Sequence, residues 1–181
     1  MTAELSFRTQ RLELVAATLE HVLAELSGQG ALAALLKVQV PSSWPPGEYD
    51  RDALEFFKGK LESASPEEHG WYNWYVISLG TSGSRESLVA GAGYLGPPSG
   101  GTVEIGYSVV PEARGQGYAS EIVEALVAHA FKSPSVRSVI AQAQDTNEAS
   151  ASVLHRCGFQ AVGPGLAAGS TRYERRQSAT T

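Results

Sequence analysis

The sequence predicts an α/β (α+β) fold in which helices cover both faces of one sheet, giving three layers. One strand-like segment is followed by helices, three strands, a helix, a strand, a helix and two strands. Short breakers join the three consecutive strands, which predicts an antiparallel meander. Helices separate the later strands, so the central sheet is expected to be mixed but mostly antiparallel, with six to seven strands.

The N-terminal third is expected to contain a strand, helices and an irregular loop. Residues 7–15 alternate loosely and predict the opening strand. Two apolar runs at helical spacing follow, and Thr18 is placed to cap the first. Three prolines and a glycine in residues 41–47 predict a loop that carries Trp44. Asp50 then caps a helix with one apolar stripe.

The rest of the chain is expected to complete a single domain over residues 1–176, followed by a disordered tail at 177–181. Gly and Pro breakers delimit its elements. The expected strands are residues 71–79, 88–95, 102–110, 136–143, 159–162 and 171–175. The expected helices are residues 117–132 and 148–157.

Composition excludes several classes of function. The 19 acidic residues outnumber the 14 basic ones, which argues against a nucleic-acid partner. Cys157 is the only cysteine, so neither an internal disulfide nor a multi-cysteine metal site is possible, and no metal is expected. No run approaches the roughly 20 apolar residues of a membrane span, and the N-terminus lacks a secretory pattern. A cytoplasmic protein without a membrane partner is expected.

The most informative segment, residues 105–120, is a strand, a basic glycine-rich turn and the start of a helix. Unpaired amides and the positive end of the helix dipole bind anions there, and Gly115 and Gly117 would let phosphate oxygens approach. No Gly-Lys-Ser/Thr follows, which excludes a P-loop, and Ser120 breaks the dinucleotide fingerprint. By itself the turn is equally consistent with a tight structural connection.

Residues 114–119, Arg-Gly-Gln-Gly-Tyr-Ala, match the Gln/Arg-x-x-Gly-x-Gly/Ala signature, and here the chain resembles the GNAT acetyltransferases. The closer resemblance is to their ribosomal-protein N-acetyltransferase (RimJ/RimL-like) branch. Further matches to that branch are Thr9-Gln10-Arg11-Leu12, Glu104-Ile105-Gly106-Tyr107, Asn147-x-x-Ser150 and Gly158-Phe159. These matches are spread in order over most of the chain, so they are more specific than the turn alone.

The resemblance implies an acetyl-coenzyme A (acetyl-CoA) site. The pyrophosphate would lie on the amides of residues 114–119, and the pantetheine along residues 107–110, where this strand splays from residues 136–143. The residues expected to bind the cofactor are Val109, Val110, Arg114, Gly115, Gln116, Gly117, Tyr118, Ala119, Ser120, Asn147 and Ser150.

Acetyl transfer to an amine needs a group that takes a proton and a group that returns one to the thiolate. Glu104 is the candidate base, since it lies on an otherwise uncharged strand just before the turn; a surface or hairpin-edge glutamate is nearly as plausible. By resemblance Ser150 lies near the sulfur and Asn147 contacts the cofactor, whereas capping of the helix is the structural alternative. Many GNAT enzymes have a tyrosine where this chain has Leu154, which leaves the proton donor open.

The amine is expected to contact Glu104 and Trp44, with Trp44 acting as a lid over the substrate. The acidic residues between 48 and 68 form either a solvated face or a field that favours a cation. The expected function is direct acetyl transfer from acetyl-CoA to a primary amine, of a protein N-terminus or a small molecule, by a monomer or homodimer. The alternative is a non-catalytic acyl-CoA-binding sensor or assembly module.

Overall fold

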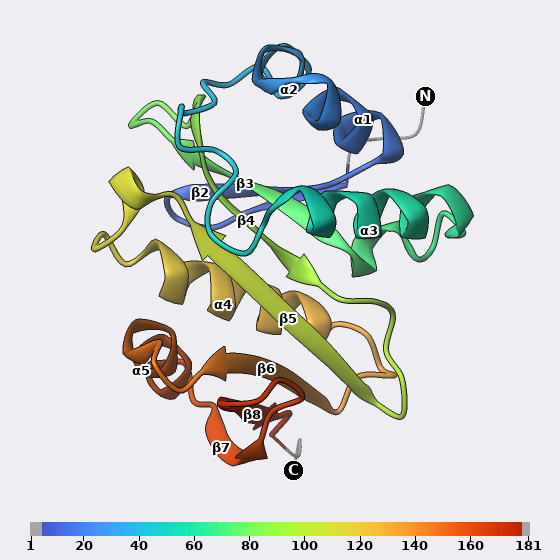
Figure 1. The fold of residues 1–181 in the computed structure, drawn as a ribbon, viewed down its shortest axis with the longest axis vertical. Coiled ribbons are helices and arrows are strands. Elements are labelled where there is room, and N and C mark those ends of the chain that lie inside the picture. Colours follow the sequence, from blue (N-terminus) through green and yellow to red (C-terminus); the bar gives the residue numbers. More distant parts are fainter. Residues whose placement is uncertain (1–4, 179–181) are drawn as a thin grey trace.

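The computed structural model describes residues 5–178, which form one sheet of eight strands with helices on both faces (Figure 1). The strands are β1 (Ser6–Arg8), β2 (Leu12–Ala16), β3 (Asn73–Leu79), β4 (Arg85–Tyr94), β5 (Thr102–Val109), β6 (Ser138–Gln144), β7 (Gln160–Pro164) and β8 (Ser170–Arg176). The α-helices are α1 (Leu19–Ser27), α2 (Gln29–Leu36), α3 (Arg51–Ser63), α4 (Tyr118–Ala130) and α5 (Glu148–Arg156). Short 3₁₀ turns span His69–Trp71 and Pro111–Ala113.

The sheet is mixed and mostly antiparallel, as predicted, in the order β1-β2-β3-β4-β5-β6-β8-β7. Among the eight strands within residues 5–178, β5 and β6 are the one parallel pair. Their pairing runs from Thr102 opposite Ser138 to Ile105 opposite Ala141, and both strands continue past it. The sheet therefore splits beyond Ile105, in the region where the resemblance implied that the strands splay.

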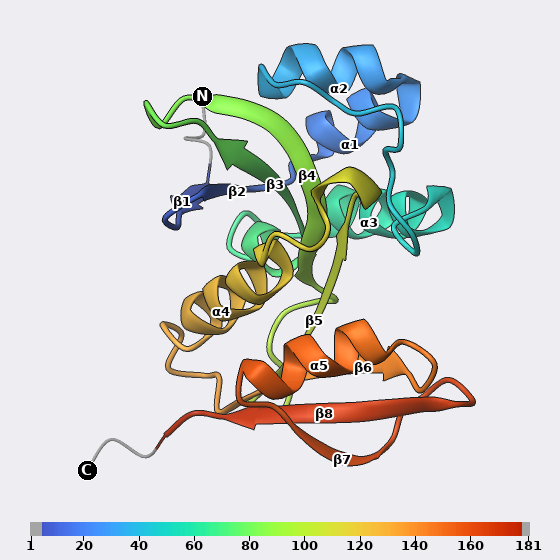
Figure 2. The same cartoon turned by 90° about the vertical axis from the view of Figure 1, so that its left-hand side faces the viewer.

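Helices α1, α2 and α3 cover one face of the sheet, and α4 covers the other (Figure 2). Helix α4 packs against β5, and α5 contacts α4 and β6. Side chains that alternate along β5 separate these layers, because Val103 and Ile105 are buried while Gly106 and Ser108 face the α3 side. Both layers thus meet at the end of β5, beside the split.

Two local features differ from the predictions. The opening strand is a hairpin of β1 and β2, because the chain reverses at Thr9, whose amide donates to the Leu12 carbonyl at 2.9 Å. This adds a strand and brings the sheet to eight. At the other end, the amide of Gln177 donates to the Arg137 carbonyl at 2.9 Å, so the expected tail is still attached there. The last three residues of that tail lie outside the described residues.

Within residues 5–178, no helix combines the length and apolar character that crossing a membrane requires. The same part of the chain holds no cluster of three His, Cys, Asp or Glu side chains arranged to bind a metal ion.

Candidate active site

The glycine-rich turn has the geometry of an anion site. Gly115 and Gly117 have φ angles of 73° and 81°, in the left-handed region that other residues rarely adopt, so glycine is needed at both positions. Gly117 is the N-cap of α4 and offers no side chain, so the first amides of the helix are not capped by it. A Cβ added at Gly115 would have no atom within 4 Å, which leaves open space over the turn.

Arg11, from the N-terminal segment of the chain, stabilises this turn through its side chain. Its Nη1 donates to the Gln116 carbonyl at 2.8 Å, and its Nε donates to Glu121 at 2.8 Å. Its guanidinium also lies 4.8 Å from the centre of the Tyr118 ring. Thr9 adds a hydrogen bond to the Glu121 carboxylate at 2.6 Å. The contacts explain structurally why the chain has Thr9 and Arg11 in the β1–β2 turn.

A cavity of about 520 Å³, here named the turn cavity, lies between this turn, the end of β5 and α5. Of the residues expected to bind a cofactor, those that line it are Val109, Arg114, Gly115, Gly117, Tyr118, Ala119, Ser120, Asn147 and Ser150. The Ser120 hydroxyl is buried without a hydrogen-bond partner among the described residues. An orphaned hydroxyl and uncapped helix amides fit a polar, phosphate-bearing ligand.

Val110 and Gln116 occupy different places from those expected. Val110 is 1% exposed, and its amide donates to the Val89 carbonyl. The Gln116 side chain turns back to the Glu112 carbonyl, and its own carbonyl accepts from Arg11. Both residues hold the turn in shape, whereas the residues around them line the cavity.

Asn147 and Ser150 begin α5. The Asn147 side chain accepts from the Ser150 amide at 3.0 Å, so it is the N-cap, and Asp145 instead accepts from Thr171. The capping interpretation therefore holds for Asn147, which also lines the turn cavity. The Ser150 hydroxyl lies 2.9 Å from the hydroxyl of Tyr107.

Tyr107 is the main residue that the sequence analysis missed. It lies on β5 just past the split and lines the turn cavity. It also lines a cavity of about 310 Å³ between β5 and β6, the split cavity, and one of about 270 Å³ under α3, the α3 cavity. Burial raises the pKa of Tyr107, so its hydroxyl keeps its proton at neutral pH. The only signal in the sequence was its place after Gly106 in the Glu-Ile-Gly-Tyr match.

Glu104 lies in the paired part of β5, opposite Ile140. Its carboxylate accepts a hydrogen bond from the Gln142 side chain at 2.8 Å. Among the described residues, Gln142 lines the split cavity and Glu104 does not. The Gln142 side-chain amide therefore lies between the Glu104 carboxylate and the split cavity.

Trp44 corrects the expectation of a lid. Its indole is 4% exposed and donates to the Glu25 carboxylate. Glu25 also accepts from the hydroxyls of Tyr49 at 3.1 Å and Tyr75 at 2.6 Å. Burial raises the pKa of Glu25 despite these hydrogen bonds. The proline-rich loop is therefore anchored by its tryptophan, and Tyr49 rather than Trp44 lines the α3 cavity.

Two residues interpreted as structural are placed as expected. The His129 ring stacks on Phe7 at 4.9 Å, and burial lowers its pKa, so it is a neutral packing residue. Cys157 is 2% exposed, and burial raises the pKa of its thiol, which argues against a nucleophile.

Comparison with protein families matches residues 11–160 to the acetyltransferase (GNAT) domain. The chain belongs to the GNAT acetyltransferase family. This match confirms the predicted family, its N-acetyltransferase activity and acetyl-CoA as its cofactor. A comparison of this GNAT acetyltransferase with curated proteins finds no match.

Solved structures share the fold along nearly the whole chain. A ribosomal-protein-S5-alanine acetyltransferase from Vibrio fischeri has a TM-score of 0.65 at 16% identity, covering 97% of this chain and 98% of that one. A GNAT-family acetyltransferase from Bacillus anthracis has 0.62 at 21%, covering 95% and 98%. RimL, a ribosomal L7/L12 alpha-N-protein acetyltransferase solved with coenzyme A, has 0.64 at 20%, covering 97% and 100%. At these identities the likeness shows the GNAT fold.

From the contacts of Arg11 with the turn we predict the effect of one substitution in this GNAT acetyltransferase. Arg11→Ala removes the donors to Gln116 and Glu121, so the turn should loosen and coenzyme A should bind about tenfold more weakly, as judged by calorimetric titration. Arg51→Ala is the control, because it removes an equal charge from an exposed pair on α3. Equal affinities for coenzyme A in the two folded variants would contradict a stabilising role of Arg11 at the turn.

Proposed function

We propose that this acetyltransferase transfers acetyl from acetyl-CoA to a primary amine by direct attack in a ternary complex. The observation that carries the proposal is the meeting of three cavities at Tyr107. A cofactor in the turn cavity and an amine in the α3 cavity would both reach the split between β5 and β6. Two substrates held side by side can react directly, so that no covalent enzyme intermediate is needed.

The turn would hold the diphosphate of the cofactor. Uncapped amides at the start of α4 and the helix dipole favour an anion, although the whole chain has a net charge of −5. The part of β5 beyond Ile105 has no ladder partner in β6, so its backbone is available to an extended arm of the cofactor. When bound, acetyl-CoA supplies the thioester that the amine attacks.

Ser150 and Tyr107 would return the proton. As the carbon–nitrogen bond forms and the carbon–sulfur bond breaks, the thiolate takes a proton from the Ser150 hydroxyl, which takes one from Tyr107 at 2.9 Å. Tyr107 is reprotonated by the second proton that the nitrogen loses as it becomes an amide. The raised pKa of Tyr107 keeps this proton available at neutral pH. In this proposal Tyr107 takes the role of the tyrosine that many GNAT enzymes have at the position of Leu154.

A carboxylate near the split would take the proton that the amine loses. Glu104, the residue favoured by the sequence, reaches the split through the Gln142 amide. Glu48 lines the split cavity directly and also lines the α3 cavity. The two residues make different predictions, which amine kinetics separate.

The acceptor belongs to one of two classes. Two of the compared structures carry the names of ribosomal-protein acetyltransferases, which favours the amine of a protein N-terminus. The α3 cavity is also large enough for a small amine.

Thiol release from acetyl-CoA over a panel of amines and peptides tests the proposal. We expect release that matches the acetylated amine, and we expect Tyr107→Phe and Ser150→Ala each to lower kcat by about tenfold to hundredfold, with a much smaller effect on coenzyme A affinity. Ser135→Ala, on an exposed loop, is the matched control. Tight cofactor binding without release on any acceptor would favour the sensor or assembly module.

A further inference from the structure

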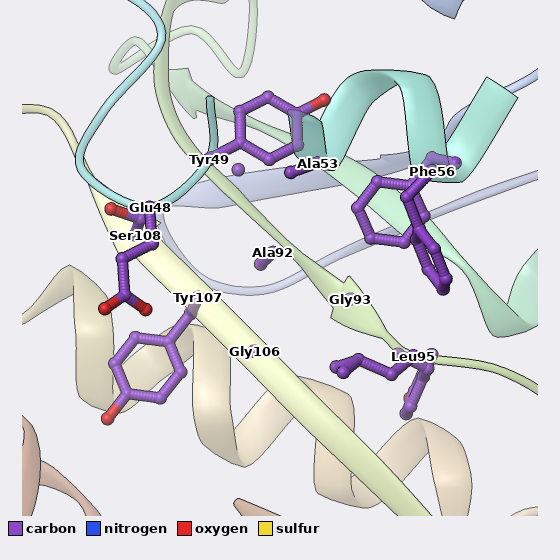
Figure 3. Close-up of a pocket in the computed structure, with 13 residues that line it drawn as sticks. Glu48, Tyr49, Ala53, Phe56, Ala92, Gly93, Leu95, Gly106, Tyr107 and Ser108 are labelled. Carbon is purple, nitrogen blue, oxygen red and sulfur yellow. The ribbon is translucent and has the colours of Figure 1, made fainter. Parts of the chain in front are cut away.

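The α3 cavity is apolar along most of its wall (Figure 3). Aromatic rings of Tyr49, Phe56 and Phe57 form one side, and Ala92 and Leu95 lie across from them on and after β4. Its volume, about 270 Å³, suits a body of the size of one aromatic side chain. Phe56 is 45% exposed, so an apolar ligand would cover a ring that otherwise faces water.

One carboxylate interrupts this apolar wall, where the α3 cavity adjoins the split cavity. Glu48 lines both the α3 cavity and the split cavity. Figure 3 shows its carboxylate extending past Ser108 toward Tyr107. It is therefore the acidic side chain that an amine in the α3 cavity would meet on its way to the split.

The backbone around Glu48 is held in place from both sides. Gly47 has a φ of 55° and lies so close to β5 that an added Cβ would be 2.8 Å from the Ser108 hydroxyl. On the other side, the Tyr49 hydroxyl donates to Glu25 and accepts from Asn73 at 3.0 Å. The backbone at Glu48 is therefore held in place, so only its side chain has to be ordered when it binds a ligand.

We propose that Glu48 receives the ammonium of an apolar primary amine whose body, of aromatic size, fills the α3 cavity. This inference rests on the proposed function. The ammonium passes one proton to Glu48, and the lone pair that this frees forms the carbon–nitrogen bond. The carbon–sulfur bond then breaks and the thiolate takes a proton from the Ser150 side, which regains it from the second proton that the nitrogen loses. A free arylalkylamine and the first residue of a peptide share this chemistry.

The same wall selects against amines with a second charge. A diamine of similar length would place its distal ammonium against Phe56 and Phe57, where the lining offers no second carboxylate. The Lys60 ammonium already lies 5.3 Å from the centre of the Phe56 ring, so a second positive charge there would be repelled. The acidic surface around α3 attracts cations in general, so the discrimination must come from the cavity.

The experiment compares 2-phenylethylamine, a tripeptide amide with N-terminal phenylalanine, and putrescine, by thiol release and by calorimetric binding to the protein loaded with coenzyme A. We expect at least one apolar amine to exceed putrescine by about tenfold or more in kcat/KM. Glu48→Gln should lower this value, and the binding of the amine, by about tenfold to hundredfold, with coenzyme A affinity unchanged. Glu55→Gln, an exposed carboxylate on α3, should change neither.

A second variant tests the cavity without touching a charge. Ala53→Phe, on the α3 wall, should reduce turnover of phenylethylamine while sparing methylamine, which needs no space there. Whichever of 2-phenylethylamine and the tripeptide amide has the higher kcat/KM shows whether the amine comes from a small molecule or from a peptide N-terminus. Preference for putrescine would overturn the inference.

Glu104→Gln separates the inference from the proposed function. If it slows turnover while Glu48→Gln does not, Glu104 is the base, the inference is overturned and the acetyltransferase proposal stands. If apolar amines bind in a manner that requires Glu48 but no amine releases thiol, the Glu48 site stands and the proposed function fails. Absence of both binding and turnover overturns both.

Discussion

Replacing Ala119 with glutamate is expected to weaken coenzyme A binding by about 100-fold or more. Ala119 lies in the first turn of α4 and lines the turn cavity. A carboxylate there would occupy the anion site and repel a diphosphate. The helix itself should tolerate the change, because acidic side chains stabilise the first turn and Ala119 has ordinary helical geometry, unlike Gly115 and Gly117.

Calorimetric titration with coenzyme A measures this loss, and thermal unfolding verifies that the variant is folded. Ala128→Glu is the matched control, because it adds the same charge to an exposed position of α4 more than two turns away. We expect the control to bind coenzyme A as the parent does. Unchanged affinity in a folded Ala119→Glu variant would contradict the placement of the diphosphate at this turn.

Replacing Glu25 with alanine is expected to lower the free energy of unfolding by about 4 kcal/mol. Three buried donors, from Trp44, Tyr49 and Tyr75, lose their shared acceptor. The loop that carries Glu48 is held through two of these donors, so turnover of amines should fall as well. Glu20→Ala, at an exposed position of the same helix, should cost little. Equal unfolding midpoints in urea for the two variants would contradict the anchoring role of Glu25.

The pH dependence of stability provides a second test of the Glu25 cluster. Burial raises the pKa of Glu25 in the folded chain, so the folded state holds this proton more tightly than the unfolded state does. Its contribution to stability is therefore present at low pH and is lost as the pH rises from about 4.3 through the folded pKa. In Glu25→Gln this loss should be absent. Urea unfolding from pH 4 to 8 measures the difference between parent and variant, and parallel curves would contradict it.

Features that depend on neighbouring residues were predicted well. Thr18 and Asp50 cap α1 and α3, as their side chains and the apolar stripes that follow them indicated. The two glycines of the turn have the positive φ angles that demand glycine. These are local requirements, in which a residue type directly reflects a backbone conformation or an unpaired amide.

Features that join distant segments were not predictable from the pattern. Trp44 was expected to act as a lid over the substrate, yet its indole is buried and donates to Glu25, 19 positions away in the sequence. Tyr107 and Ser150 are 43 positions apart, and only the packing of α5 beside β5 brings their hydroxyls together. Arg11 belonged to a recognised motif, but its work on the turn 105 positions later is visible only in the folded chain.

The sequence by itself thus determined the fold class and the order of its elements, because both follow from local periodicity, caps and glycine positions. Its motifs indicated the GNAT family by resemblance. The tertiary structure decided which side chains line the three cavities. In the folded chain Trp44 is buried in the core, and Tyr107 and Glu48 line the split cavity between β5 and β6. The physical reason is that the contents of a cavity depend on contacts between remote segments, and neither spacing nor local conformational preference records those contacts.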